Sequence, residues 1–338
     1  MAPPKPPKRP ARRSVPLTPP LDETNEVLPQ EGATYPQILR GPHASRLRSG
    51  AGVVFGLVLF YLLSASLVSQ VVVALGYSVS GRRESWAEYY RQAFAFERPV
   101  GMLGVNLGLA TLIPIAWAML AVLHRVRPRW LSSVQPRLRW RYLLLCGPVA
   151  VVSLLGVQVV PGVVTGTTAF HPQHGFWGFL VVILVSSPLQ AAAEEVFFRG
   201  YLLQALGSLA ARPWVGIVGS SVVFALLHGS QNLPLFVDRL AFGLLAALLV
   251  WRTGGLEAGI AAHVVNNIFA FVIAGLTSSI ATLKAVQSLS WLDASLDVGS
   301  FALFAVLAYL TFRALRLRHT VELVASRPGG LGGGRSLQ

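Results

Sequence analysis

The sequence predicts an all-α fold: a polytopic membrane helix bundle of about eight transmembrane helices with its functional site in the bundle interior. Three observations support this prediction. Hydrophobic residues make up 53% of the 338 residues and charged residues only 12%, whereas soluble domains contain about 25% charged residues. Apolar runs of about 20 residues, long enough to cross a bilayer, recur along the chain. Some of these runs contain ionisable side chains, which are costly in a membrane and therefore indicate function.

The chain is predicted to have one membrane domain, which lies between two polar ends. Residues 1–48 are rich in Pro and Arg without apolar periodicity, which predicts a disordered basic cytoplasmic tail. This stretch is too long and too Pro-rich for a secretory leader, so we expect no signal peptide cleavage. Residues 49–318 form the predicted transmembrane domain, and residues 319–338 a flexible Gly-rich tail.

The membrane domain divides into apolar segments of different lengths. One of them exceeds thirty residues, which is too long for one straight span, so we expect a kink near Pro188 or a separate preceding piece. The expected segments are 50–76, 99–123, 142–165, 176–210, 213–229, 234–251, 256–276 and 299–315.

The distribution of positive charge predicts the orientation of the chain. The formal net charge is +14, but the basic residues lie beside apolar segments, where they set topology and meet anionic lipid. We therefore expect a multi-pass protein of the cell membrane with both termini cytoplasmic, a lipid bilayer as partner, and no nucleic acid. The single cysteine, Cys146, lies in an apolar segment and excludes an intramolecular disulfide or a thiolate metal site.

The first ionisable cluster contains Glu194, Glu195 and Arg199. The i,i+4 spacing places Glu195 and Arg199 on one helix face as an ion pair, while Glu194 points about 100° away. One carboxylate is thus braced and the other is free to face a cavity. The alternative is a buried pair that only fixes helix packing.

Two further clusters follow on later apolar segments. Phe224 and His228 share a helix face, and His263 aligns with Asn267 while Asn266 approaches from i,i+3. An imidazole and a carboxamide on one helix can stabilise an oxyanion. The alternatives are a snorkelling or hydrogen-bonded histidine in the first case and Asn-mediated helix packing in the second.

The three clusters lie at similar depths. At 1.5 Å per residue, Glu194, His228 and His263 lie roughly 20, 22 and 10 Å from the cytoplasmic ends of their segments. All fall within one half-to-middle zone of a core about 30 Å thick. We therefore expect them to converge on one site.

The residue types at this site favour hydrolysis by activated water. A carboxylate near a neutral histidine in a low-dielectric cavity can take a proton from water. No Ser or Cys nucleophile stands at a recognisable motif, which disfavours an acyl-enzyme. Zn²⁺ is the other route, with Glu194, His228 and His263 as a sufficient ligand set. The chain has no HExxH helix, and the sequence leaves both routes open.

In this order the motifs resemble the CPBP family of intramembrane proteases, which comprises CAAX prenyl endopeptidases and Abi (bacteriocin-processing) proteins. The family pattern of Glu-Glu-x-x-x-Arg, Phe-x-x-x-His and His-x-x-x-Asn is complete at 194–199, 224–228 and 263–267. The resemblance covers roughly residues 175–280.

The resemblance implies a role for each motif residue. Glu194 and His228 would activate the water, His263 and Asn267 would form the oxyanion pocket, and Glu195 and Arg199 would hold the site in register. Eukaryotic members of the family clip the last three residues from prenylated CAAX sequences, and some bacterial members are linked to bacteriocin immunity or peptide maturation. The implied activity is an intramembrane endopeptidase acting on a membrane-associated or lipidated peptide or protein.

Two other functions remain compatible with the same residues. A non-catalytic membrane adaptor or bacteriocin-immunity protein would use the polar constellation to bind a peptide or a partner helix. A transporter would use intramembrane Glu, His and Arg as a proton relay, although no inverted repeat with paired broken helices is evident.

Overall fold

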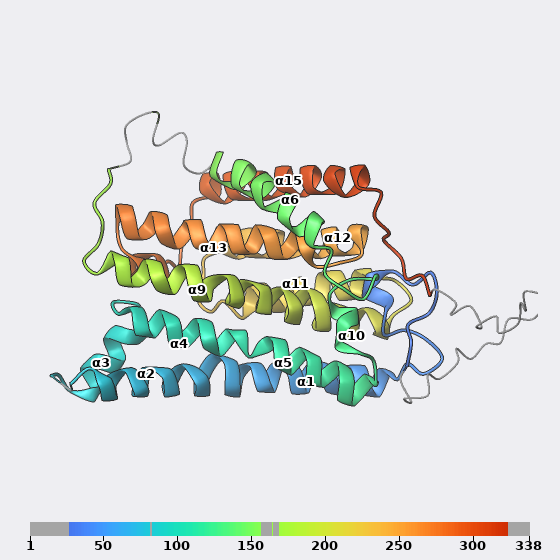
Figure 1. The fold of residues 1–338 in the computed structure, drawn as a ribbon, viewed down its shortest axis with the longest axis horizontal. Helices are drawn as coiled ribbons and strands as arrows, with labels where there is room; N and C mark the ends of the chain where they lie inside the picture. The colour runs from blue at the N-terminus through green and yellow to red at the C-terminus, as the bar shows by residue number, and fades with distance from the viewer. Residues whose placement is uncertain (1–26, 82, 157–163, 165–168, 324–338) are drawn as a thin grey trace, which may run out of the picture.

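A computed structural model describes residues 27–81, 83–156, 164 and 169–323, and the described chain is an all-α bundle (Figure 1). Within these residues no β-strand occurs, and strand-like pairing is limited to two isolated bridges. The predicted fold class is therefore confirmed.

The first half of the bundle contains two long helices and a third, shorter one; a π-type segment lies within the first long helix and at the end of each of the other two. Its elements are η1 (Tyr35–Gln37), α1 (Arg46–Leu59), η2 (Phe60–Leu67), α2 (Val68–Val79), α3 (Trp86–Phe94), α4 (Pro99–Ala110), α5 (Leu112–Ala118), η3 (Met119–Leu123), η4 (Pro128–Leu131), α6 (Trp140–Ala150) and η5 (Val151–Leu155). The end of the expected 142–165 segment falls largely outside the described residues.

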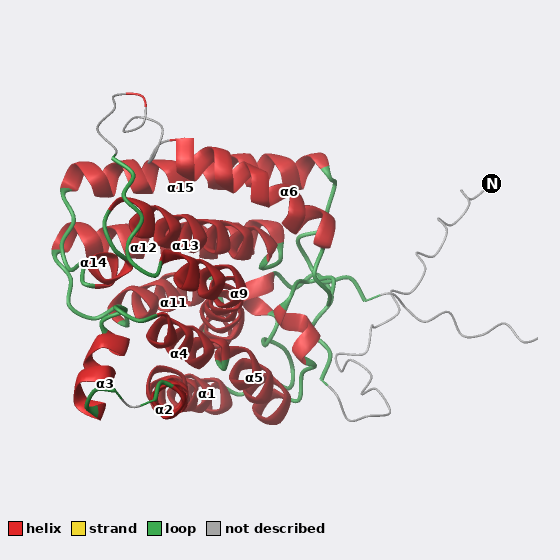
Figure 2. Cartoon of the chain, turned by 60° about the vertical axis from the view of Figure 1, so that its left-hand side comes forward, coloured by secondary structure: helices red, strands yellow, loops and turns green. Residues whose placement is uncertain are grey.

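The second half contains the helices that carry the motifs. They are α9 (Phe176–Glu194), η6 (Glu195–Leu202), α10 (Leu203–Leu209), α11 (Trp214–Leu226), α12 (Leu233–Thr253), α13 (Glu257–Thr277), α14 (Ile280–Lys284) and α15 (Trp291–Ala314). Figure 2 shows the bundle partly end-on, with α9 in its middle. Helix α9 packs between α4 and α13, which places the first motif at the centre of the molecule.

Six of the described helices are long and apolar enough to cross a membrane, and two shorter apolar helices, Trp140–Leu155 and Trp214–Leu226, accompany them. Much of their apolar surface faces outward. On α9, for example, Val181 is 63% and Val185 71% exposed. Large exposed apolar surfaces of this kind are unfavourable in water and suit contact with lipid tails.

The expected segment 176–210 forms the long helix Phe176–Leu209. Pro188 lies inside the α-helix Phe176–Glu194, where a proline removes one backbone hydrogen bond. The irregular part is instead the π-type segment Glu195–Leu202, which carries Glu195 and Arg199. Such π-type turns occur frequently at functional sites.

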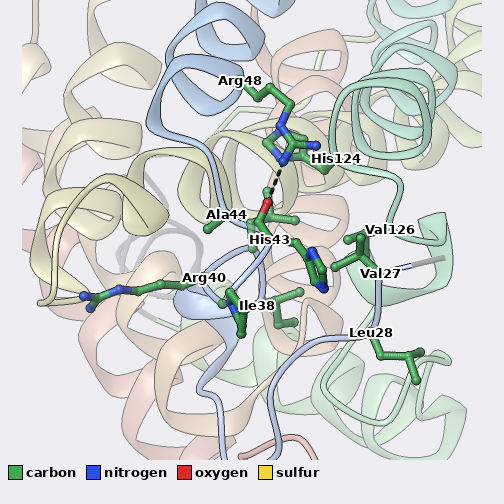
Figure 3. Close-up of a pocket in the computed structure, with 12 residues that line it drawn as sticks. Val27, Leu28, Ile38, Arg40, His43, Ala44, Arg48, His124 and Val126 are labelled. Atoms are coloured by element: carbon green, nitrogen blue, oxygen red, sulfur yellow. Dashed lines mark hydrogen bonds between the residues drawn. The ribbon is translucent and has the colours of Figure 1, made fainter. Parts of the chain in front are cut away.

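Part of the N-terminal segment expected to be disordered is ordered. Residues 1–26 lie outside the described residues, but Tyr35, Ile38 and Leu39 are buried in the core. The Tyr35 hydroxyl donates to the carbonyl oxygen of Leu131. Figure 3 shows the small pocket between this segment and the bundle, where Arg48 donates to the His43 carbonyl oxygen. A few apolar side chains thus anchor a stretch whose composition alone favours disorder.

The two described ends of the chain meet at one end of the bundle. Gly32 N donates to Val321 O (2.8 Å), and Val321 N donates to Ala33 O (2.9 Å). The described part of the C-terminal tail, residues 319–323, therefore packs on the N-terminal segment, while residues 324–338 lie outside the described residues.

The same end of the bundle holds the start of α13 through a buried ion pair. Glu257, in the first turn of α13, accepts from Arg139 N (2.9 Å), Nε (2.8 Å) and NH2 (2.6 Å). A carboxylate at a helix N-terminus is also favoured by the helix dipole. This contact fixes the helix that carries His263 and Asn267.

Candidate active site

A cavity of about 600 Å³ lies inside the bundle, and all three sequence clusters contribute to its wall. Glu194 comes from the end of α9, His228 from just beyond α11, and His263 with Asn267 from α13. The structure thus brings together four of the six predicted site residues around one space. Glu195 and Arg199 are buried behind this wall.

His263 lies between the two adjacent glutamates. Its Nδ1 is 2.9 Å from Glu195 Oε1, and its Nε2 is 3.5 Å from Glu194 Oε2. A carboxylate accepts hydrogen bonds, so Nδ1 carries a proton and donates it to Glu195. The longer distance leaves Glu194 less tightly bound than Glu195, and Glu194 is the carboxylate that reaches the cavity.

Arg199 neutralises Glu195 inside the protein. Its NH1 is 2.9 Å from Glu195 Oε1, and the Arg199 and Glu195 side chains are 1% and 0% exposed. The guanidinium carbon lies 4.0 Å from the ring centroid of Phe224 and 5.0 Å from that of Phe242. These cation–π contacts and the ion pair fix the side chain that holds Glu195, and through Glu195 they orient His263.

His228 presents one ring nitrogen for chemistry. Its Nδ1 lies 2.7 Å from the carbonyl oxygen of Phe224, its i−4 residue. A carbonyl only accepts, so Nδ1 carries the proton and Nε2 is left as an acceptor. Surrounding protein atoms lower the pKa of His228 to about 4, and the charge of Arg239 adds to the effect. His228 is accessible from the cavity and is neutral at pH 7.

The amide side chains of the third cluster have separate places. Asn267 Nδ2 donates to Gln190 Oε1 (2.9 Å), which leaves its second N–H available to the cavity. Asn266 contacts Asn267 Oδ1 at 3.4 Å and is absent from the described cavity wall.

Several polar residues of the cavity wall are not among the residues predicted from the sequence, and two of them are amides close to the motif helix α9. Gln190 lies one turn before Glu194 on the same helix face. Asn106, on α4, donates to Ser186 Oγ (2.9 Å) and Ser187 Oγ (3.2 Å) of α9. The sequence signal that could have found them is an isolated amide side chain inside an apolar segment, because a buried amide in a membrane needs a hydrogen-bond partner.

A zinc site would need Glu194, His228 and His263 to surround one point as metal ligands. Over the described ranges, no group of three or more His, Cys, Asp or Glu side chains is placed to hold a metal ion. His263 also uses Nδ1 for Glu195. Glu194, His228 and His263 therefore do not fit a three-ligand zinc site in this arrangement.

The cavity reaches the surface at the end of the bundle opposite to the chain ends. Ser230, Lys284 and Gln287 line it there and are exposed. The same cavity also has two exposed apolar lining residues, Ala65 and Leu227. Its opening therefore combines a polar rim with an apolar side.

Comparison with known proteins finds a family match for the helices that carry the three motifs. Residues 176–269 match the family model of type II CAAX prenyl endopeptidases, Rce1-like, and contain all three motifs. An uncharacterized protein, YyaK, of Bacillus subtilis (strain 168) is 26% identical over 167 residues. This match covers 46% of the chain and 56% of YyaK, about half of each protein. No solved structure matches the chain. The stretch 176–269 is therefore similar to the Rce1-like family.

Proposed function

We propose that this protein is an intramembrane endopeptidase that hydrolyses a peptide bond in a membrane-associated or lipidated peptide or protein. The observation that carries the proposal is the shared cavity lined by Glu194, His228, His263 and Asn267. The match of residues 176–269 to the Rce1-like family model supports a CAAX-type protease. A cavity of about 600 Å³ has room for both water and a peptide segment.

The chemistry proceeds by activation of water. The lone pair of His228 Nε2 orients a water molecule, and Glu194 takes its proton as general base. The resulting hydroxide attacks the carbonyl carbon of the scissile bond. Glu194 then gives the proton to the leaving amine as the C–N bond breaks, so the carboxylate is restored.

The negative charge that develops on the carbonyl oxygen needs donors in place. His263, through Nε2–H, and Asn267, through its second Nδ2–H, supply them from one face of α13. Since Nδ1 of His263 already donates to Glu195, the donating Nε2–H requires a second proton on the ring. The carboxyl groups of Glu194 and Glu195 lie on its two sides, 3.5 Å from Nε2 and 2.9 Å from Nδ1.

The opening of the cavity supports a membrane-associated substrate. The apolar residues Ala65 and Leu227 suit a lipid chain or an apolar side chain, and the polar rim suits the hydrated peptide backbone. Both termini are proposed to be cytoplasmic, because the described ends share one end of the bundle with the loop over 124–141 and with Arg252.

The test is turnover of a fluorogenic prenylated CAAX-type peptide by the full chain in proteoliposomes. Glu194→Gln and His228→Gln should each lower kcat/KM by at least about 100-fold while leaving thermal unfolding unchanged. Glu88→Gln, an exposed change on α3 away from the cavity, is the matched control. Wild-type rates in both site variants would refute the assignment. Retention of the peptide by wild type without turnover would identify a binding adaptor instead.

A further inference from the structure

The cavity wall contains two basic side chains that the hydrolytic chemistry does not use. Arg239 projects from α12, and Lys284 is the last residue of α14. Among the described lining residues, Glu194 is the only Asp or Glu. The part of the cavity away from the catalytic groups is therefore positively charged.

Packing at the open end of the cavity brings these side chains toward each other. Arg239 NH1 donates to Gln231 Oε1 (2.8 Å), which directs the guanidinium toward the start of α12. Asn232 N donates to Gln287 O (2.8 Å), and its Nδ2 donates to Leu289 O (2.9 Å). These bonds tie the start of α12 to the segment that follows Lys284.

Lys284 itself is held over an aromatic ring, with Nζ 5.1 Å from the ring centroid of Phe96. Partial burial lowers the pKa of Lys284, and the nearby charge of Arg239 lowers it further. Two cations that repel each other in a partly desolvated wall are unfavourable without an anion. Among the described residues neither side chain forms an ion pair; the charge of Asp238, the neighbour of Arg239 in the sequence, acts on Arg239, but Asp238 is not part of the described cavity wall.

We propose that Arg239 and Lys284 form an anion-binding subsite of the cavity for a carboxylate or phosphate group. The favoured occupant is the C-terminal carboxylate of the substrate peptide, because it is an anion that every unmodified peptide carries into the catalytic cavity. The phosphate of a lipid headgroup is the other source, since the cavity also has an apolar side. The assignment of a peptide rests on the proposed function, but the anion subsite does not.

The first measurement is binding, which does not depend on turnover. A farnesylated CAAX-type peptide is prepared once with a free carboxylate and once with a C-terminal carboxamide. Glu194→Gln protein in phosphatidylcholine vesicles should bind the carboxylate form about tenfold more tightly, which is typical of a charge-assisted hydrogen bond. Adding Lys284→Met should remove this preference, and Lys284→Arg should keep it. Equal affinity for both peptides overturns the carboxylate assignment.

The control is Arg83→Met, which removes the same charge from an exposed residue outside the cavity. Methionine preserves the chain length over Phe96, so Lys284→Met should fold normally. Arg239→Met provides a second, independent loss of the subsite.

The second measurement separates the two sources of anion. Turnover of both peptides is followed while phosphatidylglycerol replaces phosphatidylcholine in the vesicles. Both lipids carry a phosphate, but choline neutralises it in phosphatidylcholine, whereas phosphatidylglycerol is a net anion. If a lipid phosphate occupies the subsite, phosphatidylglycerol should therefore alter both rates equally, and Lys284→Met should abolish that response. Failure of wild type to cleave either peptide counts against the proposed function, whereas a carboxylate preference in binding would still support the subsite. Equal binding, together with no lipid response that depends on Lys284, refutes the subsite.

Discussion

At the residue scale, the site depends on the different surroundings of two adjacent glutamates. Glu195 has Arg199 NH1 and His263 Nδ1, each 2.9 Å from the same oxygen. Glu194 has the longer contact to His263 Nε2, at 3.5 Å, and a side-chain hydrogen bond with Gln190, and it reaches the cavity. The sequence predicted the divergence of the two carboxylates and the pairing of Glu195 with Arg199. It could not predict the bond between Glu195 and His263, because these residues are 68 positions apart.

The low pKa of His228 predicts the acid limit of activity. The group has a pKa of about 4, below the usual value of about 6.5, so its neutral form is present above pH 4 and is lost as pH falls through this value. In proteoliposomes, kcat/KM should therefore fall as the pH drops through this value, which gives the pH profile an acid limb. His228→Gln cannot be protonated there, so its residual activity should lack the limb. A limb that persists in this variant would belong to another group.

Removal of Arg199 should destabilise the fold. Arg199→Met leaves the Glu195 carboxylate buried and partly uncompensated, at a cost of about 3–5 kcal/mol in the free energy of unfolding. The double variant Glu195→Gln with Arg199→Met should recover much of this loss, because no unpaired charge remains. Denaturation in detergent of both single variants and the double variant gives the coupling energy. Additive losses would show that the pair contributes no coupling.

At the element scale, the site requires close contact between α13 and the π-type segment η6. The helices approach where Gly259, one turn before His263, faces Glu195. A β-carbon at Gly259 would lie 2.7 Å from Glu195 Oε2. The Glu195 side chain is fully buried and paired with Arg199, so it has little freedom to move. This packing joins residues 64 positions apart, so no local sequence pattern specifies it.

Gly259→Ala should therefore separate α13 from η6 and weaken the contact between Glu195 and His263. We expect a loss of about 1–3 kcal/mol in stability, typical of overpacking, and a clear fall in kcat. Thermal unfolding and turnover measure the two effects. Gly299→Ala on α15 is the matched control, because its β-carbon meets open space and alanine favours helix. Equal behaviour of the two variants would contradict the role of Gly259.

At the scale of the whole molecule, one cluster of basic residues lies at the end of the bundle opposite to the cavity opening. Arg252 is in the last turn of α12, whereas Asn232, which binds Gln287 and Leu289 near the opening, caps its start. The basic end also holds Arg139, which donates to Arg318 O (3.2 Å). If positive charge marks the cytoplasmic side, the polar rim of the cavity faces the opposite side, rather than the cytoplasm.

Cysteine labelling tests this orientation. Cys146 is fully buried, so an introduced cysteine reports on its own position. In intact cells, a membrane-impermeant maleimide should label Ser288→Cys, near the opening, and leave Ala44→Cys unlabelled, although both positions are exposed. Both should be labelled after permeabilisation. The reverse pattern in intact cells would place the opening on the cytoplasmic side.

The sequence by itself determined the membrane class, the helical architecture and the residues with the strongest chemical character. These follow from local properties: the length of apolar runs, the cost of charge in lipid, and the spacing of side chains on one helix. The tertiary structure decided which of these side chains face the cavity, that Tyr35 anchors part of a Pro-rich segment, and that Arg239 and Lys284 share the cavity with Glu194. Such outcomes depend on contacts between residues far apart in the chain, whose geometry is fixed only when the helices pack.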